Sequence, residues 1–204
     1  MSKKRIASFD VDQTLLDHKT YQIPESALRA VNELRKDFYI VLSTGRDMDN
    51  YYSKQYRDVI QPDAVIHLNG TKITVGGELI YEHEMDRTLL KEILDYADKA
   101  GYALGVTIGN EDYYLHPEVV EETDRLRWGR SERRFKDPRS LLDQGVRTLA
   151  YIGKEDGAMD MEKRFPQLKF LMFAGRLGAD VVEREASKAK GLLRLCQYYG
   201  TAPE

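Results

Sequence analysis

Short apolar runs that end in polar residues recur in the first third of the chain. They cover residues 6–9, 38–42 and 63–68, and segments with apolar residues on one helical face follow the first two runs, near 24–34 and 47–56. Strands that are apolar along their whole length are typical of parallel sheets buried on both faces. Alternating strands and helices with short links therefore predict a right-handed, doubly wound parallel sheet.

The pattern changes after residue 72. Two short runs, 73–75 and 78–81, are joined by Gly76-Gly77 and predict a β-hairpin in which the glycines supply positive φ angles. The segments that follow have a mixed order, which predicts an α+β module with an antiparallel sheet. The predicted helices lie near 86–99, 117–126 and 155–165, and the predicted strands near 102–107, 113–115, 147–151 and 168–173.

The last part of the chain is expected to complete the first domain. Residues 179–182 have the pattern of a strand returning to that domain, and apolar residues between Leu192 and Tyr199 predict a final helix that ends at Gly200. The expected fold class is α/β. It combines a doubly wound parallel-sheet core, formed by residues 1–81 and 179–204, with an inserted α+β cap domain at residues 82–178.

Two carboxylates follow the first apolar run. Asp10 and Asp12 are separated by one residue and lie where a parallel strand would end, at the edge of the sheet that binds ligands in open α/β folds. Neighbouring carboxylates repel each other, and a hard divalent cation such as Mg²⁺ relieves that repulsion. One carboxylate can then be an ionised nucleophile and the other a proton carrier, which is the division of roles that phosphate-ester transfer needs.

Further polar groups are expected at the same edge. Thr44, Gly45 and Arg46 follow the second run, where a hydroxyl and backbone N–H groups at the start of a helix can hold phosphate oxygens. Lys188 is a compact cation that could pair with both the nucleophile and a transferred phosphoryl group. None of these residues is diagnostic by itself.

The order of the motifs is more specific. DVDQTLLD at residues 10–17, STGR at 43–46, LNG at 68–70 and SKAKGLLRL at 187–195 together resemble the haloacid dehalogenase (HAD) superfamily of phosphatases. More closely, they resemble the Cof-type sugar-phosphate phosphatases, which carry a large α+β cap. The resemblance implies a HAD-like core and a Mg²⁺-dependent phosphatase that hydrolyses a small phosphorylated metabolite through an aspartyl-phosphate intermediate.

The resemblance also implies a role for each motif residue. Asp10 would attack phosphorus, while Asp12 would protonate the leaving alcohol, activate water and help to hold Mg²⁺ through its backbone carbonyl. The implied catalytic residues are Asp10, Asp12, Thr44 and Lys188, the implied substrate-binding residues are Thr44, Gly45, Arg46, Asn69 and Lys188, and the implied metal ligands are Asp10 and Asp12.

Two features depart from the family pattern. Gln13 stands where these phosphatases usually have glycine, so its side chain is expected to crowd the turn. The family's fourth motif, a GDxxND-like acidic strand end, would follow Lys188 beyond Glu204. We therefore expect a truncated chain whose metal is under-coordinated, and the alternative to an active phosphatase is a catalytically impaired or dead HAD-like binding protein.

The overall charge argues against a large polyanionic partner. The chain has 31 basic and 34 acidic side chains and a net charge of −3, so neither nucleic acid nor a membrane surface is expected to bind it. The apolar run after Arg5 is too short for a signal peptide or a membrane span, which favours a cytoplasmic protein. The lone Cys196 is expected to be a buried structural thiol. The sequence leaves the substrate and the oligomeric state open.

Two smaller features have alternative interpretations. The segment from Arg125 to Arg139 could bind a second anionic group of the substrate, could contact RNA, or could be a solvated loop balanced by nearby acids. The four histidines show no spacing typical of zinc sites. Among them, His18 follows the first strand closely and is expected on a flap over the site.

Overall fold

The structure is a computed structural model, and it describes residues 4–202. The chain divides into two compact units, which are described separately below. Unit 1 comprises Met1–His83 and Ala186–Glu204, and unit 2 comprises Glu84–Glu185. No helix in the described range is both long and apolar enough to cross a membrane.

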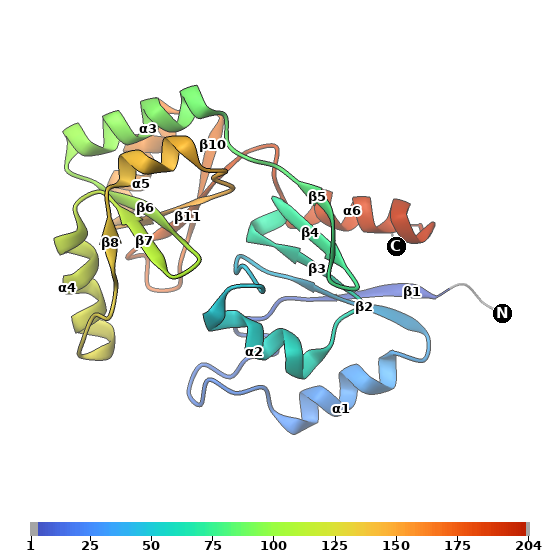
Figure 1. Cartoon of the computed structure of the whole chain (residues 1–204). Helices are drawn as coiled ribbons and strands as arrows, with labels where there is room; N and C mark the ends of the chain where they lie inside the picture. The colour runs from blue at the N-terminus through green and yellow to red at the C-terminus, as the bar shows by residue number, and fades with distance from the viewer. Residues whose placement is uncertain (1–3, 203–204) are drawn as a thin grey trace. The chain divides into compact units, whose positions relative to one another are not determined.

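Unit 1 contains a five-stranded sheet in the order β1-β2-β3-β4-β5 (Figure 1). The first three strands are parallel to one another, as predicted. The predicted hairpin adds the last two strands in antiparallel orientation, and Gly76 and Gly77 form its turn with φ angles of 58° and 88°. The strands are β1 (Arg5–Phe9), β2 (Phe38–Ser43), β3 (Ala64–His67), β4 (Lys72–Val75) and β5 (Glu78–Glu82).

Helices cover both faces of this sheet, which confirms the doubly wound arrangement. On one face, α1 (Glu25–Leu34) and α2 (Tyr51–Ile60) pack against strand residues that include Ile40 and Leu42. On the other face, α6 (Lys188–Tyr199) places Leu195 against residues of β2, β3 and β4. Figure 1 shows α6 and α1 on opposite sides of the strands.

Unit 2 is an α+β module built on a six-stranded sheet in the order β10-β11-β9-β6-β7-β8. Its strand pairs are antiparallel except for β7 and β8. Helices α3 and α5 contribute to the larger core of the unit, while α4 contributes Val120 to a separate cluster with Ala103 and Tyr114. The elements are α3 (Arg87–Ala100), β6 (Ala103–Ile108), β7 (Glu111–Tyr114), α4 (Pro117–Trp128), β8 (Phe135–Lys136), β9 (Leu149–Ile152), α5 (Glu155–Arg164), β10 (Leu168–Met172) and β11 (Ala179–Glu183).

The predicted return to the first domain at residue 179 is wrong. Strand β11 lies between β10 and β9 in the sheet of unit 2, where Ala179 and Val181 are fully buried in the larger core of that unit. Unit 2 therefore extends to Glu185, and its first residue is Glu84, slightly later than the predicted 82. An apolar run shows that a strand is buried, but it does not show which sheet takes the strand.

Helix α6 packs closely against β3 because Gly191 has no side chain. A Cβ atom at this position would lie 2.7 Å from Cγ2 of Ile66, which is closer than packed carbon atoms normally approach. Since α6 begins at Lys188, this contact also fixes the position of the lysine.

Gly191→Ala is predicted to destabilise the protein by about 1–3 kcal/mol, because overpacking outweighs the gain in helix propensity of about 1 kcal/mol. Chemical denaturation measures the change. Adding Ile66→Ala should recover part of the loss that Gly191→Ala causes, since it removes the clashing methyl group. Additive effects of the two substitutions would contradict the close contact.

Candidate active site

The first strand and the last helix meet at Asp10. The Nζ atom of Lys188 lies 2.7 Å from Oδ2 of Asp10, and the backbone N–H of Val11 donates to Oδ1 at 2.7 Å. The side chains of Asp10 and Lys188 are 42% and 35% exposed, so both remain open to solvent. The structure thus brings together the predicted nucleophile and the predicted cation.

The LNG motif follows β3 in the chain. It contacts both the turn after β2 and the residue that precedes α6. Leu68, Asn69 and Gly70 all have positive φ angles, of 50°, 56° and 101°. A Cβ atom on Gly70 would lie 2.3 Å from the carbonyl oxygen of Ser187, so only glycine fits there. Ser187 in turn caps α6 by accepting a hydrogen bond from the N–H of Lys190 at 3.0 Å. This packing sets the position of the helix that carries the lysine.

The STGR motif makes a tight turn beside the LNG motif. Thr44 is fully buried, and its carbonyl accepts from the N–H of Asn69 at 3.0 Å. Its Oγ1 accepts from the N–H of Arg46 at 3.1 Å and keeps its own hydrogen to donate. Gly45 lies between the two residues. Asn69 is buried as well, and its backbone joins the two motifs.

Asp12 is held by two basic side chains. Arg46 binds it in bidentate fashion, with Nε 2.7 Å from Oδ2 and Nη2 2.7 Å from Oδ1. Nε2 of His18 lies 3.1 Å from the same Oδ1 atom. The family resemblance implies that Arg46 binds the substrate, whereas in this structure its guanidinium group pairs with Asp12. His18 lies beside Asp12 on the segment of residues 11–22, which we call the flap, close to where it was expected.

These contacts determine the charge on Asp12. Burial works to raise the pKa of this carboxyl group, but hydrogen bonds and charge interactions with Arg46 and His18 outweigh burial and lower the pKa. The bond to Asp12 likewise raises the pKa of Arg46, although burial opposes this. Asp12 is therefore ionised and paired in this structure.

The flap begins with a turn around Val11. The Val11 carbonyl accepts from the N–H groups of Thr14, Leu15 and Leu16 at 3.3, 3.0 and 2.8 Å. Gln13 lies inside this turn with a φ angle of 61°, a left-handed conformation that glycine adopts without strain. A side chain was expected to crowd the turn at this position.

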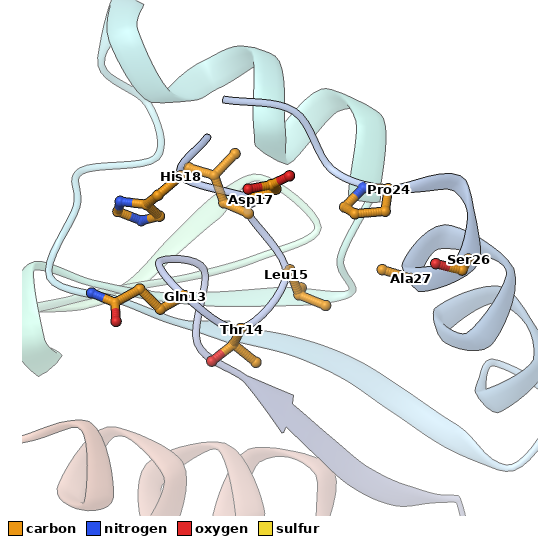
Figure 2. Close-up of a pocket in the computed structure, with 9 residues that line it drawn as sticks. Gln13, Thr14, Leu15, Asp17, His18, Pro24, Ser26 and Ala27 are labelled. Atoms are coloured by element: carbon orange, nitrogen blue, oxygen red, sulfur yellow. The ribbon is translucent and has the colours of Figure 1, made fainter. Parts of the chain in front are cut away.

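A shallow pocket lies beside the flap and not over Asp10. Figure 2 shows its lining, with Gln13 and His18 at one side and Pro24 and Ala27 of the α1 region at the other. Asp10, Asp12 and Lys188 are not part of the lining. The pocket is therefore distinct from the contact between Asp10 and Lys188, where we place the candidate chemistry.

The oxygen atoms near Asp10 suit a hard cation. Each carboxylate oxygen of Asp10 accepts one hydrogen bond and so retains a further lone pair. Both carboxylate oxygens of Asp12 are engaged by Arg46, which leaves its backbone carbonyl as the atom that fits the predicted role. Mg²⁺ is commonly bound by one or two carboxylates together with waters and substrate phosphate, and this donor set is compatible with it.

A second acidic cluster lies nearby. Asp47, Asp49 and His67 bring possible ligand atoms within 4.8 Å of one another. However, Nζ of Lys72 lies 3.1 Å from Asp47 and 2.7 Å from Asp49, and Nδ1 of buried His67 lies 3.2 Å from Oδ1 of Asp47. The lysine supplies the positive charge that these carboxylates need, so we interpret the group as an ion-pair cluster that holds the loop after the STGR motif.

The basic segment of unit 2 is largely paired with acids. Arg133 bonds to buried Asp124 at 2.7 Å and to buried Asp112 at 3.0 Å. Arg139 pairs with Asp95 and Asp98. For Arg133 and Arg139, these contacts support the charge-balanced interpretation of the segment.

A family model of haloacid dehalogenase-like hydrolases matches residues 7–204. The chain belongs to this family. The predicted HAD resemblance is therefore confirmed. The search of curated proteins found no match.

Solved structures share the HAD-like fold. The phosphatase BT1666 from Bacteroides thetaiotaomicron has a TM-score of 0.86 and 22% identity, over 98% of this chain and 74% of its own. The HAD subclass IIB sugar phosphatase BT4131 has a TM-score of 0.78 and 21% identity, over 98% and 77%. A hypothetical protein from Geobacillus kaustophilus HTA426 has a TM-score of 0.80 and 21% identity, over the same shares. At these identities the likeness shows the fold.

Gln13→Gly is predicted to stabilise the protein by about 0.5–1 kcal/mol, because glycine adopts the left-handed conformation without the steric cost of a Cβ atom. Thermal unfolding measures the change. Gln13→Ala is the control and should bring no gain, since alanine retains the Cβ atom. Equal stabilisation by both substitutions would contradict the backbone explanation.

Asp47→Asn is predicted to change how stability depends on pH. Burial works to raise the Asp47 pKa, but His67 and Lys72 outweigh it and hold this pKa well below its ordinary value of 3.8. The charged form of Asp47 therefore stabilises the fold at pH values above 3.8, and this contribution is lost as the pH falls toward the pKa of Asp47 in the folded protein. The variant should be less stable at neutral pH and should lose less stability between about pH 5 and pH 2.

Urea denaturation across this pH range tests the prediction. Asp58→Asn is a suitable control because it removes a carboxylate that is 53% exposed and paired with Arg57. An acid slope that is unchanged by Asp47→Asn would show that the ion-pair cluster does not have the proposed effect.

Proposed function

We propose that this HAD-like hydrolase is a Mg²⁺-dependent phosphatase of a small phosphorylated metabolite, of the sugar-phosphate type. The observation that carries the proposal is the ion pair between Asp10 and Lys188, with Asp12 held beside it. A solvent-accessible carboxylate next to a lysine is suited to attack phosphorus, since the cation offsets the repulsion between two anions. The similarity to BT4131, described as a sugar phosphatase, supports this substrate class.

The proposed reaction has two steps. An Asp10 oxygen bonds to phosphorus as the bond to the leaving alcohol breaks, and Asp12 supplies the proton that the alcohol oxygen takes. Asp12 then accepts a proton from water while the water oxygen bonds to phosphorus and the bond to Asp10 breaks. The products are the alcohol and inorganic phosphate.

Other residues support these steps. Lys188 keeps Asp10 and the phosphoryl group in register, and the Thr44 hydroxyl can donate to a phosphoryl oxygen. When bound at Asp10 and the Asp12 carbonyl, Mg²⁺ supplies neutralisation of negative charge. Because Arg46 keeps Asp12 ionised in this structure, the proposal includes a turn of Arg46 from Asp12 to the substrate, which leaves Asp12 able to take a proton.

Asp10→Asn is predicted to lower the hydrolysis of 4-nitrophenyl phosphate by roughly three orders of magnitude or more, because the amide cannot form the covalent intermediate. Activity is measured with Mg²⁺ and with a chelator, and a panel of phosphorylated sugars then identifies the preferred substrate. The chelator should abolish turnover.

Asp58→Asn is the matched control and should retain full activity, with thermal unfolding confirming that both variants are folded. Unaltered protein that is inert with Mg²⁺, or that turns over equally well after Asp10→Asn, would refute the proposal. Inertness with Mg²⁺ would favour the binding-protein alternative.

A further inference from the structure

Asp12 belongs to a closed ring of contacts within unit 1. Its carboxylate bonds to Arg46 and to His18. The guanidinium carbon of Arg46 lies 5.6 Å from the ring centroid of Tyr56. The Tyr56 hydroxyl donates to the carbonyl of Tyr21 at 3.4 Å, and the ring centroids of Tyr21 and His18 are 6.1 Å apart. The ring joins the flap to α2 around a single carboxylate.

The flap presents His18 to Asp12 because it folds back on itself. The N–H of Asp17 donates to the carbonyl of Gln22 at 3.0 Å, and the N–H of Tyr21 donates to the carbonyl of Asp17 at 2.8 Å. These bonds close a tight loop in which His18 directly follows Asp17. The histidine therefore approaches Asp12 from a different element than Arg46, which follows β2.

The contact requires no change in the charge of the histidine. An ionised carboxylate can only accept hydrogen bonds, so Nε2 of His18 is the donor, and a neutral imidazole provides that donor. Among the hydrogen bonds of the described residues, that of His18 goes to Asp12, and none joins it to Asp10 or Lys188.

We infer that His18 is a positioning residue that keeps the Asp12 carboxyl group in place while Arg46 turns to the substrate. The inference rests on the proposed phosphatase function. Arg46 and His18 both hold Oδ1 of Asp12, but only Arg46 holds Oδ2. Once Arg46 has moved, Oδ2 can carry the proton for the leaving alcohol while the flap still holds Oδ1.

This role predicts that the effect of losing His18 depends on the leaving group of the substrate. Proton donation matters most when the leaving group is a poor one, because a good leaving group departs as an anion without help. Loss of a residue that positions the acid should therefore slow poor leaving groups selectively, whereas a general structural defect would slow all of them alike.

His18→Ala is predicted to lower kcat about 10-fold for phenyl phosphate but less than about 3-fold for 4-nitrophenyl phosphate, with little change in KM, since general acid catalysis is impaired and binding is not. His18→Gln should restore part of the loss, because its amide can donate to Asp12. The same two substitutions at His83, which follows β5 in unit 1, are the matched controls and should not change the ratio between the substrates. An equal loss on both substrates, or no loss on either, would overturn the inference.

A second measurement does not depend on turnover. The 15N chemical shift of a ring nitrogen responds to the hydrogen bond that it makes, so the Nε2 shift of His18 should change in Asp12→Ala while the ring shifts of His83 stay the same. An Nε2 shift of His18 that is unaltered in Asp12→Ala would also overturn the inference. If the unaltered protein hydrolyses neither aryl phosphate, the proposed function fails, while this spectrum still decides whether His18 holds Asp12.

Discussion

The ion pair between Asp10 and Lys188 is the interaction on which the candidate site depends. Its partners are 178 positions apart in the sequence: Asp10 directly follows β1, and Lys188 is the first residue of α6. Both side chains are more than one third exposed, and ion pairs of this kind typically contribute only about 0–1 kcal/mol to stability. The pair therefore contributes little to the stability of the fold. Lys188 is instead positioned by the close packing of α6 at Gly191 and of Ser187 at Gly70.

Of the seven non-glycine residues with positive φ angles in the described part of the chain, four lie in the flap and the LNG motif. Gln13, Leu68 and Asn69 all adopt left-handed conformations, at a typical cost of about 1–3 kcal/mol for each such residue. These loops directly follow β1 and β3. Buried residues next to the loops, such as Val11 and Ile66, hold the points where the loops begin. Such strain is typical of sites where the direction of a side chain matters more than stability, and it agrees with the proposed roles of Asp12 and His18.

Much of unit 1 could be predicted from the sequence, because its signals are local. Apolar runs marked β1, β2 and β3, and Gly76-Gly77 marked the hairpin. The motifs also named Asp10 and Lys188, which the structure brings into contact. The placement of β11 could not be predicted, since its apolar residues show that the strand is buried but do not show in which sheet.

Side-chain partners were harder to predict than strands. Arg46 pairs with Asp12, and Arg133 anchors the basic segment through Asp112 and Asp124. These pairings depend on the directions in which the side chains point in the folded protein. The spacing of residues along the sequence does not determine those directions. The Asp12 partner on the flap, His18, could be suspected from its closeness to the first strand, but the bond itself required the structure.

The central claim is that Asp10 is the nucleophile of the proposed reaction. Its most direct test is rapid acid quenching of the protein during turnover of a phosphorylated sugar, followed by mass spectrometry of the peptide that contains residues 6–19. We predict that this peptide gains one phosphoryl group, that the group is attached to Asp10, and that it disappears when the substrate is exhausted. Continued turnover without a phosphorylated peptide, or with the phosphoryl group on another residue, would contradict the account.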